Sequence, residues 1–244
     1  MLSLITPTQG NISALKRTID SLKGLIDDVV IGDLSVFQED SDAIRKFEYV
    51  ETIKVVPMPF DFLFKNGFSA ALNLLASFAK NDMILYLNVG EILASDVNET
   101  MNKVSPSYNC YFIDHATDPH HWYRVYNRKE IAWSGIIHEE IYGNLKPCSV
   151  PLFRFEDTPK DSEDPFKEWV YLQIKEVVYW NLYIKLVDQP YLAQGTNPGW
   201  IQFSMDGFTS FVDRLHDKGK LYDAFLLGDK DLLMKYINGK RSTF

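Results

Sequence analysis

Long apolar runs are missing from this sequence. Its longest apolar stretches, residues 83–87 and 177–186, end or are interrupted at charged or amide side chains, well short of the roughly 20 residues that a membrane-spanning helix needs. The first residues, 1–7, carry neither a basic region nor a long apolar core, as an export signal would require. The sequence therefore predicts a protein without a membrane span, located in the cytoplasm.

Cysteine is scarce, with two residues among 244. Cys110 and Cys148 lie far apart in the sequence and lack the spacing of a metal-binding pair. Buried free thiols in a reducing compartment are the favoured interpretation, and a disulfide is the alternative.

Positive charge is in deficit. The chain has 25 Lys and Arg against 33 Asp and Glu, a net charge of -8, which disfavours non-specific binding of nucleic acid. The short basic clusters at residues 218–220 and 240–241 are more typical of solvated surface than of a local basic patch. A glycine-rich phosphate loop followed by lysine or arginine is also missing between residues 6 and 17, which argues against a nucleotidyltransferase.

The remaining composition suits one catalytic domain. With 46% hydrophobic residues, the chain can bury one sizeable core and has room for an appended subdomain. Apolar, β-prone runs alternate with segments whose apolar residues keep helical spacing. This alternation predicts an α/β fold with a ligand site at the carboxyl ends of the strands. The expected strands are residues 2–6, 28–31, 53–56 and 83–87, and the expected helices are residues 12–22, 40–47 and 68–79.

The second half of the chain changes character. Residues 110–114, 122–126 and 130–133 are short and aromatic-rich, which suits a mixed or antiparallel extension of the sheet. From residue 164 onward the pattern is mostly helical, with helices expected at residues 166–186, 205–215, 221–227 and 229–237. We therefore expect a mixed, mostly parallel central sheet flanked by helices in residues 1–155. Residues 156–244 should form a helical C-terminal subdomain that packs on the same core.

Four stretches carry a family resemblance. They are residues 3–11 (SLITPTQGN), residues 21–35, residues 68–91, and residues 123–139, which end in His-Glu. In their order and spacing they resemble family 2 glycosyltransferases, which have the Rossmann-like A-type fold. The resemblance implies an inverting glycosyltransferase. It would transfer a sugar from a nucleoside-diphosphate sugar, in particular a UDP-linked one, to a hydroxyl acceptor.

The resemblance also implies a nucleotide site. Asp33, at the end of the second expected strand, would accept hydrogen bonds from the uracil imide or the ribose, and its alternative role is that of a turn or cap residue. Asn73 corresponds to the asparagine of an arginine-asparagine pair on the family's helix, where the arginine is replaced by Leu72. The loop that holds the base would consist of Thr6, Pro7, Thr8 and Gln9.

The family's acidic Asp-Xaa-Asp motif is altered here. Its two metal-facing positions are Asn88 and Gly90, and only Glu91 retains a carboxylate. The resemblance implies a divalent cation, Mn²⁺ or Mg²⁺, held by Glu91, Asn88 and His138. The alternative is a metal-independent site in which Arg124, Arg128 and His138 carry the charge of the diphosphate. For the two arginines, surface ion pairs are the competing interpretation.

The His-Glu pair at the end of the fourth stretch is the expected catalytic centre. Inverting transfer needs a carboxylate that takes the proton of the acceptor hydroxyl, and Glu139 is predicted to be this base. The resemblance places His138 near the diphosphate or the metal. Trp133 would stack on a sugar face or belong to the core.

Three other functions remain open. Asn88 and Gly90 suggest a catalytically inactive relative that serves as a binding module. A compact chain without a membrane anchor also fits a glycosyltransferase that acts on modified nucleic acid, as certain viruses encode, although the negative charge weighs against it. A nucleotidyltransferase ranks third. The acceptor could thus be a glycan, a protein or modified nucleic acid.

Overall fold

The computed structural model describes residues 1–49, 51–94, 104–115, 122–135, 140–157, 164–188 and 218–241. The chain forms two compact units. The first consists of residues 1–58, 71–133 and 141–161, and the second of residues 59–70, 134–140 and 162–244.

The first unit contains an eight-stranded sheet in the order β3-β2-β1-β4-β7-β6-β10-β5. The strands β3, β2, β1 and β4 run parallel to one another, and β7 is antiparallel to both β4 and β6. The strand β10 pairs parallel with β6 and antiparallel with β5. A two-stranded sheet is formed by β8 (Ile131–Ser134) and β9 (Glu140–Gly143). The strands of the large sheet are β1 (Leu2–Thr8), β2 (Ile26–Asp33), β3 (Ile53–Pro57), β4 (Met83–Tyr86), β5 (Glu91–Leu93), β6 (Cys110–His115), β7 (Trp122–Asn127) and β10 (Pro147–Asp157).

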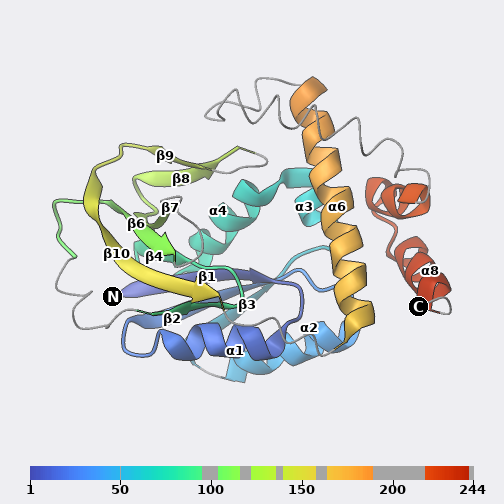
Figure 1. Cartoon of the computed structure of the whole chain (residues 1–244), viewed down its shortest axis with the longest axis horizontal. Helices are drawn as coiled ribbons and strands as arrows, with labels where there is room; N and C mark the ends of the chain where they lie inside the picture. Colours follow the sequence, from blue (N-terminus) through green and yellow to red (C-terminus); the bar gives the residue numbers. More distant parts are fainter. Residues whose placement is uncertain are drawn as a thin grey trace. The chain divides into compact units, whose positions relative to one another are not determined.

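Helices cover both faces of the parallel half of this sheet. Figure 1 shows α1 (Ile12–Ser21) and α2 (Gln38–Arg45) on one face and α4 (Phe68–Phe78) on the other. The N-cap residue of α1 is Asn11, whose side-chain oxygen accepts a hydrogen bond from Ala14 N over 3.0 Å. After α2, a short 3₁₀ helix (Lys46–Tyr49) leads toward β3. Because the parallel strands are covered on both faces, their central residues are apolar, as in residues 29–31 of β2 and throughout β4.

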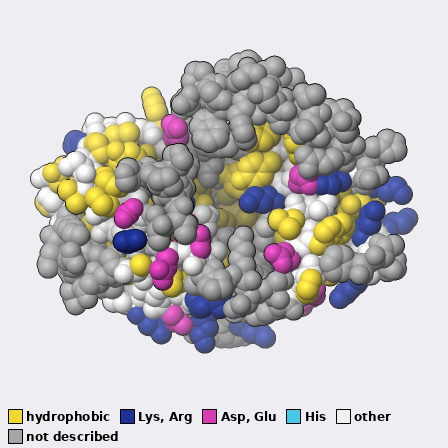
Figure 2. Space-filling model, viewed as in Figure 1, with side chains coloured by type: hydrophobic (Ala, Val, Ile, Leu, Met, Phe, Trp, Pro, Cys, Tyr) yellow, Lys and Arg dark blue, Asp and Glu magenta, His cyan; other side chains and the backbone are white. Residues whose placement is uncertain are grey.

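The core of the first unit lies between the sheet and these helices. The side chains of Leu4 and Leu85 from the sheet and of Leu15 from α1 are completely buried. On the face of the molecule seen in Figure 2, apolar side chains lie over β9 and β10. In these strands Tyr142 and Val150 are strongly exposed.

The second unit contains α3 (Phe62–Asn66), α6 (Pro165–Asp188), a helical stretch at residues 218–227 and α8 (Lys230–Arg241). The Phe64 ring packs against Tyr222 and Phe225, with centroids 5.4 and 5.6 Å apart. Asn181 and Lys185 of α6 both donate to Phe64 O, so they satisfy a carbonyl of α3. Burial lowers the pKa of Lys185.

These observations confirm the predicted fold class: an α/β fold with a mixed, mostly parallel sheet flanked by helices, and a helical C-terminal part. The helix expected at residues 205–215 lies outside the described residues. The elements that were not predicted include α3, β5, β9 and the long strand β10. The division into residues 1–155 and a C-terminal subdomain, residues 156–244, that packs on the same core stays a prediction.

Cys110 and Cys148 are both buried and free, which confirms the favoured interpretation of the thiols over a disulfide. Burial of Cys110 raises the pKa of its thiol. In the described parts of the chain, no helix combines the length and the apolar character needed to cross a bilayer.

Candidate functional site

The order of the parallel strands reverses next to β1. From β1 the chain proceeds through α1 to β2 and on to β3 on one side, and it then returns to β4 on the other side of β1. In open α/β sheets, ligands bind at the carboxyl ends of the strands at such a reversal. The loops that follow β1, β2 and β4 therefore define the candidate site, and all three belong to the first unit.

The carboxyl end of β1 presents two buried threonines. The side chains of Thr6 and Thr8 are 0% and 3% exposed. Thr8 Oγ1 accepts a hydrogen bond from Gly10 N over 3.3 Å, which shapes the loop after the strand. Thr6 Oγ1 has no hydrogen-bond partner among the described residues. The predicted loop residues Pro7 and Gln9 are half-buried.

Asp33 ends β2 beside Thr8, its partner in the parallel register. Its side chain is buried, and both carboxylate oxygens accept hydrogen bonds within the protein. Ser35 N donates to Oδ1 over 2.9 Å, and Ser41 Oγ of α2 donates to Oδ2 over 2.5 Å. The first bond closes a turn. Asp33 thus has the contacts of the alternative structural role, and a direct contact with the nucleotide stays a prediction.

The altered acidic motif forms a tight turn after β4. Gly90 has φ of 100°, and its backbone N–H donates to Thr18 Oγ1 of α1 over 3.0 Å. The side chain of Glu91 turns back on Asn88. Its Oε2 accepts from Asn88 N over 2.6 Å, and its Oε1 accepts from Asn88 Nδ2 over 3.2 Å. The carboxylate of Glu91 therefore holds the turn together from within.

Arg124 of β7 faces this turn. Its Nη1 donates to Glu91 Oε2 over 3.1 Å, and the two side chains are 12% and 6% exposed. The guanidinium carbon lies 4.8 Å from the centroid of the Tyr86 ring, a cation–π distance. Tyr86 in turn donates its hydroxyl hydrogen to Asn88 Oδ1 over 2.7 Å. Two residues predicted for different tasks, Glu91 for metal and Arg124 for phosphate, are thus bound to each other.

The described donors do not fit a divalent cation. In the described parts of the chain no cluster of three His, Cys, Asp or Glu side chains is placed to hold a metal. The carboxylate of Glu91 is already neutralised by Arg124, whereas Mn²⁺ and Mg²⁺ require several oxygen ligands. His138, the third predicted ligand, lies outside the described residues, as does the predicted base Glu139.

Asn73 of α4 is tied to the main chain of Trp133. Its Nδ2 donates to Trp133 O over 2.8 Å, and its Oδ1 accepts from Trp133 N over 2.9 Å. The buried Trp133 ring packs edge-to-face against Tyr86 and Tyr126, at centroid distances of 5.5 and 5.9 Å. Of the two interpretations of Trp133, stacking on a sugar or packing in the core, the structure has the second. Burial raises the pKa of Tyr126 far above its ordinary value.

The structure does not bring Arg128 together with Glu91 and Arg124. It follows β7 and lies beside the start of β4, since its backbone N–H donates to Asp82 O over 2.9 Å. Its Nη1 donates to Ala76 O and Ser77 O at the end of α4, and its Nη2 lies 3.9 Å from Asp82 Oδ1. Arg128 also lines a cavity of about 440 Å³, together with Asn73, Ala76, Ser77, Tyr126, Lys129, Ile131 and Ala132. The structure thus separates the two predicted phosphate-binding arginines.

Sequence reasoning missed Thr18 and Tyr86. Thr18 lies on the buried face of α1 and reads like any helical core position. Tyr86 reads as the last residue of a buried strand. Their contacts with Gly90 and Asn88 depend on the tertiary structure, so the sequence gives no signal for them.

No family model and no curated protein sequence matches this chain. Solved structures do match. TarS of S. aureus (residues 1–349), in complex with UDP-GlcNAc, is 11% identical with a TM-score of 0.46, over 99% of this chain and 92% of that chain. The galactosyltransferase LgtC, with donor and acceptor sugar analogs, is 12% identical over 52% of this chain and 58% of that chain, with a TM-score of 0.36. The glycosyltransferase GlyE of Streptococcus pneumoniae is 14% identical over 52% and 34%, with a TM-score of 0.36. The similarity concerns the fold, and membership of family 2 stays a prediction.

Proposed function

We propose that this chain is a glycosyltransferase that uses a nucleoside-diphosphate sugar, in particular a UDP-linked one. The observation that carries the proposal is the position of its altered acidic motif. Asn88 and Glu91 follow β4, at the reversal of strand order, and Thr6 of β1 comes directly after Ile5, which pairs with Tyr86 at the end of β4. This is where an open α/β sheet binds nucleotides.

The proposed donor pose follows the order of the loops. The base and ribose would lie over the loop after β1, near the carboxyl end of β2. Thr6, two residues before the end of β1, has a buried hydroxyl that lacks an internal partner among the described residues. The diphosphate would lie toward the turn after β4. In this pose the charged part of the donor meets the Arg124 side of the site and the uncharged base meets the threonines.

The proposed reaction is inverting transfer to a hydroxyl acceptor. A carboxylate takes the proton of the acceptor hydroxyl as its oxygen attacks the anomeric carbon, and the nucleoside diphosphate leaves. We assign this role to Glu139, on the resemblance of residues 123–139 to the acceptor-side segment of family 2 enzymes.

Isothermal titration of the full chain with UDP, GDP, ADP and dTDP tests the proposal. We expect UDP to bind with measurable affinity and to compete with a UDP-linked sugar. Failure of all four nucleotides to bind, both with Mn²⁺ and in chelator, would refute the proposed function.

A second candidate is a binding module without transfer activity. It is favoured by the pairing of Glu91 with Arg124, because this carboxylate is engaged inside the protein. The module would bind UDP or a glycan, yet it would neither hydrolyse nor transfer the donor sugar. A screen of donor hydrolysis separates this candidate from the enzyme.

A further inference from the structure

A cation that belongs to the chain itself faces the altered acidic motif. Arg124 Nη1 and Asn88 N both donate to Glu91 Oε2, over 3.1 and 2.6 Å. A divalent cation at Glu91 would compete with the guanidinium for this carboxylate. It would also place a second positive ion next to a side chain that is only 12% exposed, where charges are poorly screened. Arg124 thus occupies the place at the carboxylate that a metal would need.

The position of Arg124 is fixed by its surroundings. Its guanidinium lies over the Tyr86 ring at 4.8 Å. The Tyr86 ring packs edge-to-face against Trp133, and the Tyr86 hydroxyl donates to Asn88 Oδ1. Asn73 holds the main chain of Trp133 through two hydrogen bonds. A cation that is positioned before the ligand arrives loses little conformational entropy on binding.

The guanidinium also has the chemistry of a phosphate ligand. It carries five N–H donors and stays protonated at any physiological pH. The contact with Glu91 uses Nη1, and a planar guanidinium can present paired donors to phosphate oxygens. Arg124 lies at the carboxyl end of β4, because Val125 pairs with Leu85 one position before Tyr86. It is therefore on the same edge as the proposed donor site.

We infer that Arg124, held by Glu91 and Tyr86, supplies the positive charge that binds the donor diphosphate, and that nucleoside diphosphates bind without a divalent cation. The inference rests on the proposed function. It gives Glu91 the role of positioning Arg124 and makes the replacement of the two metal-facing aspartates by Asn88 and Gly90 a consistent set of changes.

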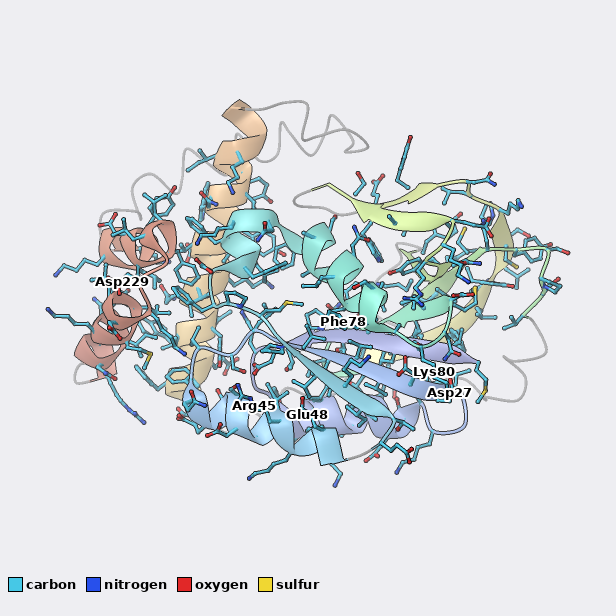
Figure 3. The ribbon with its side chains drawn as sticks, turned by 180° about the vertical axis from the view of Figure 1, so that it is seen from behind. Asp27, Arg45, Glu48, Phe78, Lys80 and Asp229 are labelled. Atoms are coloured by element: carbon cyan, nitrogen blue, oxygen red, sulfur yellow. The ribbon has the colours of Figure 1, made fainter. Side chains whose placement is uncertain are left out.

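Isothermal titration of the full chain with UDP and with uridine, each in chelator and in Mn²⁺, tests the inference. For the unmodified protein we expect the same UDP affinity in both buffers. Arg124→Gln should weaken UDP binding about tenfold to a hundredfold and leave uridine binding unchanged, since uridine lacks the diphosphate. The matched control is Arg45→Gln, which removes an exposed arginine of α2 (Figure 3) and should leave UDP affinity unchanged.

Arg124→Gln leaves Glu91 as a buried carboxylate without its cation, which can unfold the protein. The double variant Glu91→Gln with Arg124→Gln removes both charges, and it should fold and bind UDP as weakly as the single variant. UDP binding that requires Mn²⁺ in the unmodified protein would overturn the inference and leave the proposed function intact. Unchanged UDP affinity of the folded double variant would overturn it as well. Absence of binding in both buffers, for UDP as well as for GDP, ADP and dTDP, would instead refute the proposed function.

Discussion

The side-chain amide of Asn73 binds the main chain of Trp133 in both directions: it donates to the carbonyl oxygen over 2.8 Å and accepts from the N–H over 2.9 Å. The asparagine of α4 thereby acts like a strand partner of β8. Through the Trp133 ring it also fixes Tyr86, on which the Arg124 guanidinium rests.

Asn73→Ala should therefore lower stability, because two backbone groups of a buried segment lose their partner. We expect a loss of about 1–3 kcal/mol in the free energy of unfolding, measured by urea denaturation. The matched control is Asn66→Ala, which removes one exposed hydrogen bond to Phe62 O and should cost less than about 1 kcal/mol. If both variants lose the same free energy of unfolding, the hydrogen bonds from Asn73 to Trp133 stabilise the fold no more than one exposed hydrogen bond does.

Asp33 holds the turn after β2 through Ser35 N and Ser41 Oγ. Asp33→Ala should lower the free energy of unfolding by about 1.5–3 kcal/mol, because hydrogen bonds to a charged acceptor are lost. Ser41→Ala removes one of the two bonds and should cost about half as much, with UDP affinity unchanged. If Asp33→Asn keeps its stability but binds UDP at least about tenfold more weakly, the carboxylate also contacts the nucleotide. Unaltered stability of Asp33→Ala would contradict the structural role.

Gly90 has φ of 100°, in a region that side chains with a Cβ rarely adopt. Gly90→Asp, which introduces a carboxylate at the second of the two altered positions, should therefore destabilise the fold, by about 1–2 kcal/mol from backbone strain, and should not create a metal site. The control is Gly239→Ala in α8, where an added Cβ meets no atom within 4 Å and the protein should become slightly more stable. Calorimetry with and without Mn²⁺ checks both points, and a Mn²⁺-dependent rise in Tm for Gly90→Asp would contradict the prediction.

Asp27 links β2 to the loop after α4. Burial alone would raise the pKa of its carboxyl, but hydrogen bonds from Asn81 and Lys80 and the Lys80 charge lower it overall. Figure 3 shows Asp27 and Lys80 side by side. Because the folded pKa is below the unfolded one, Asp27 stabilises the fold above the ordinary pKa of about 3.8, and this contribution disappears as the pH falls through the folded pKa.

Asp27→Asn should accordingly lower Tm at pH 6–7, and the difference from the unmodified protein should shrink toward zero as the pH falls below 3.8. Thermal unfolding across this pH range measures the effect. A difference in Tm that does not change with pH would indicate that the charge of Asp27 contributes nothing.

Local patterns account for the part of the fold that was predicted. The strands β1 to β4 and the helices α1 and α4 each carry their own periodicity, so a window of ten residues is enough to recognise them. The strand β10 (Pro147–Asp157) has no such signal. It starts at a proline, alternates irregularly between buried and exposed positions, and is stabilised by pairing with β6, more than 30 residues away along the chain. Pairing of this kind is decided by tertiary contacts, which a local pattern does not contain.

Residues of the candidate site were selected from the sequence, but the contacts between them were not predicted. Asn88 and Glu91 were selected by resemblance and Arg124 for its chemistry as a phosphate ligand, but nothing in their spacing indicates that Glu91 and Arg124 form an ion pair with each other. The contacts of Arg128 were not predicted from the sequence either. It is four residues after Arg124, which corresponds to about 13 Å along an extended strand. One arginine therefore reaches the carboxyl end of β4 and the other its beginning, next to Asp82.

The proposed activity of the chain is the transfer of a sugar from a nucleotide donor. The most direct measurement is the release of UDP from a panel of UDP-linked sugars by the full chain, with Glu139→Gln as the matched variant. We expect release of UDP from at least one donor, and a decrease of roughly 10²–10⁴ in the rate of release by the variant, whose UDP affinity should stay the same. If UDP binds but no donor releases it, in chelator or in Mn²⁺, the chain is a binding module and not a glycosyltransferase.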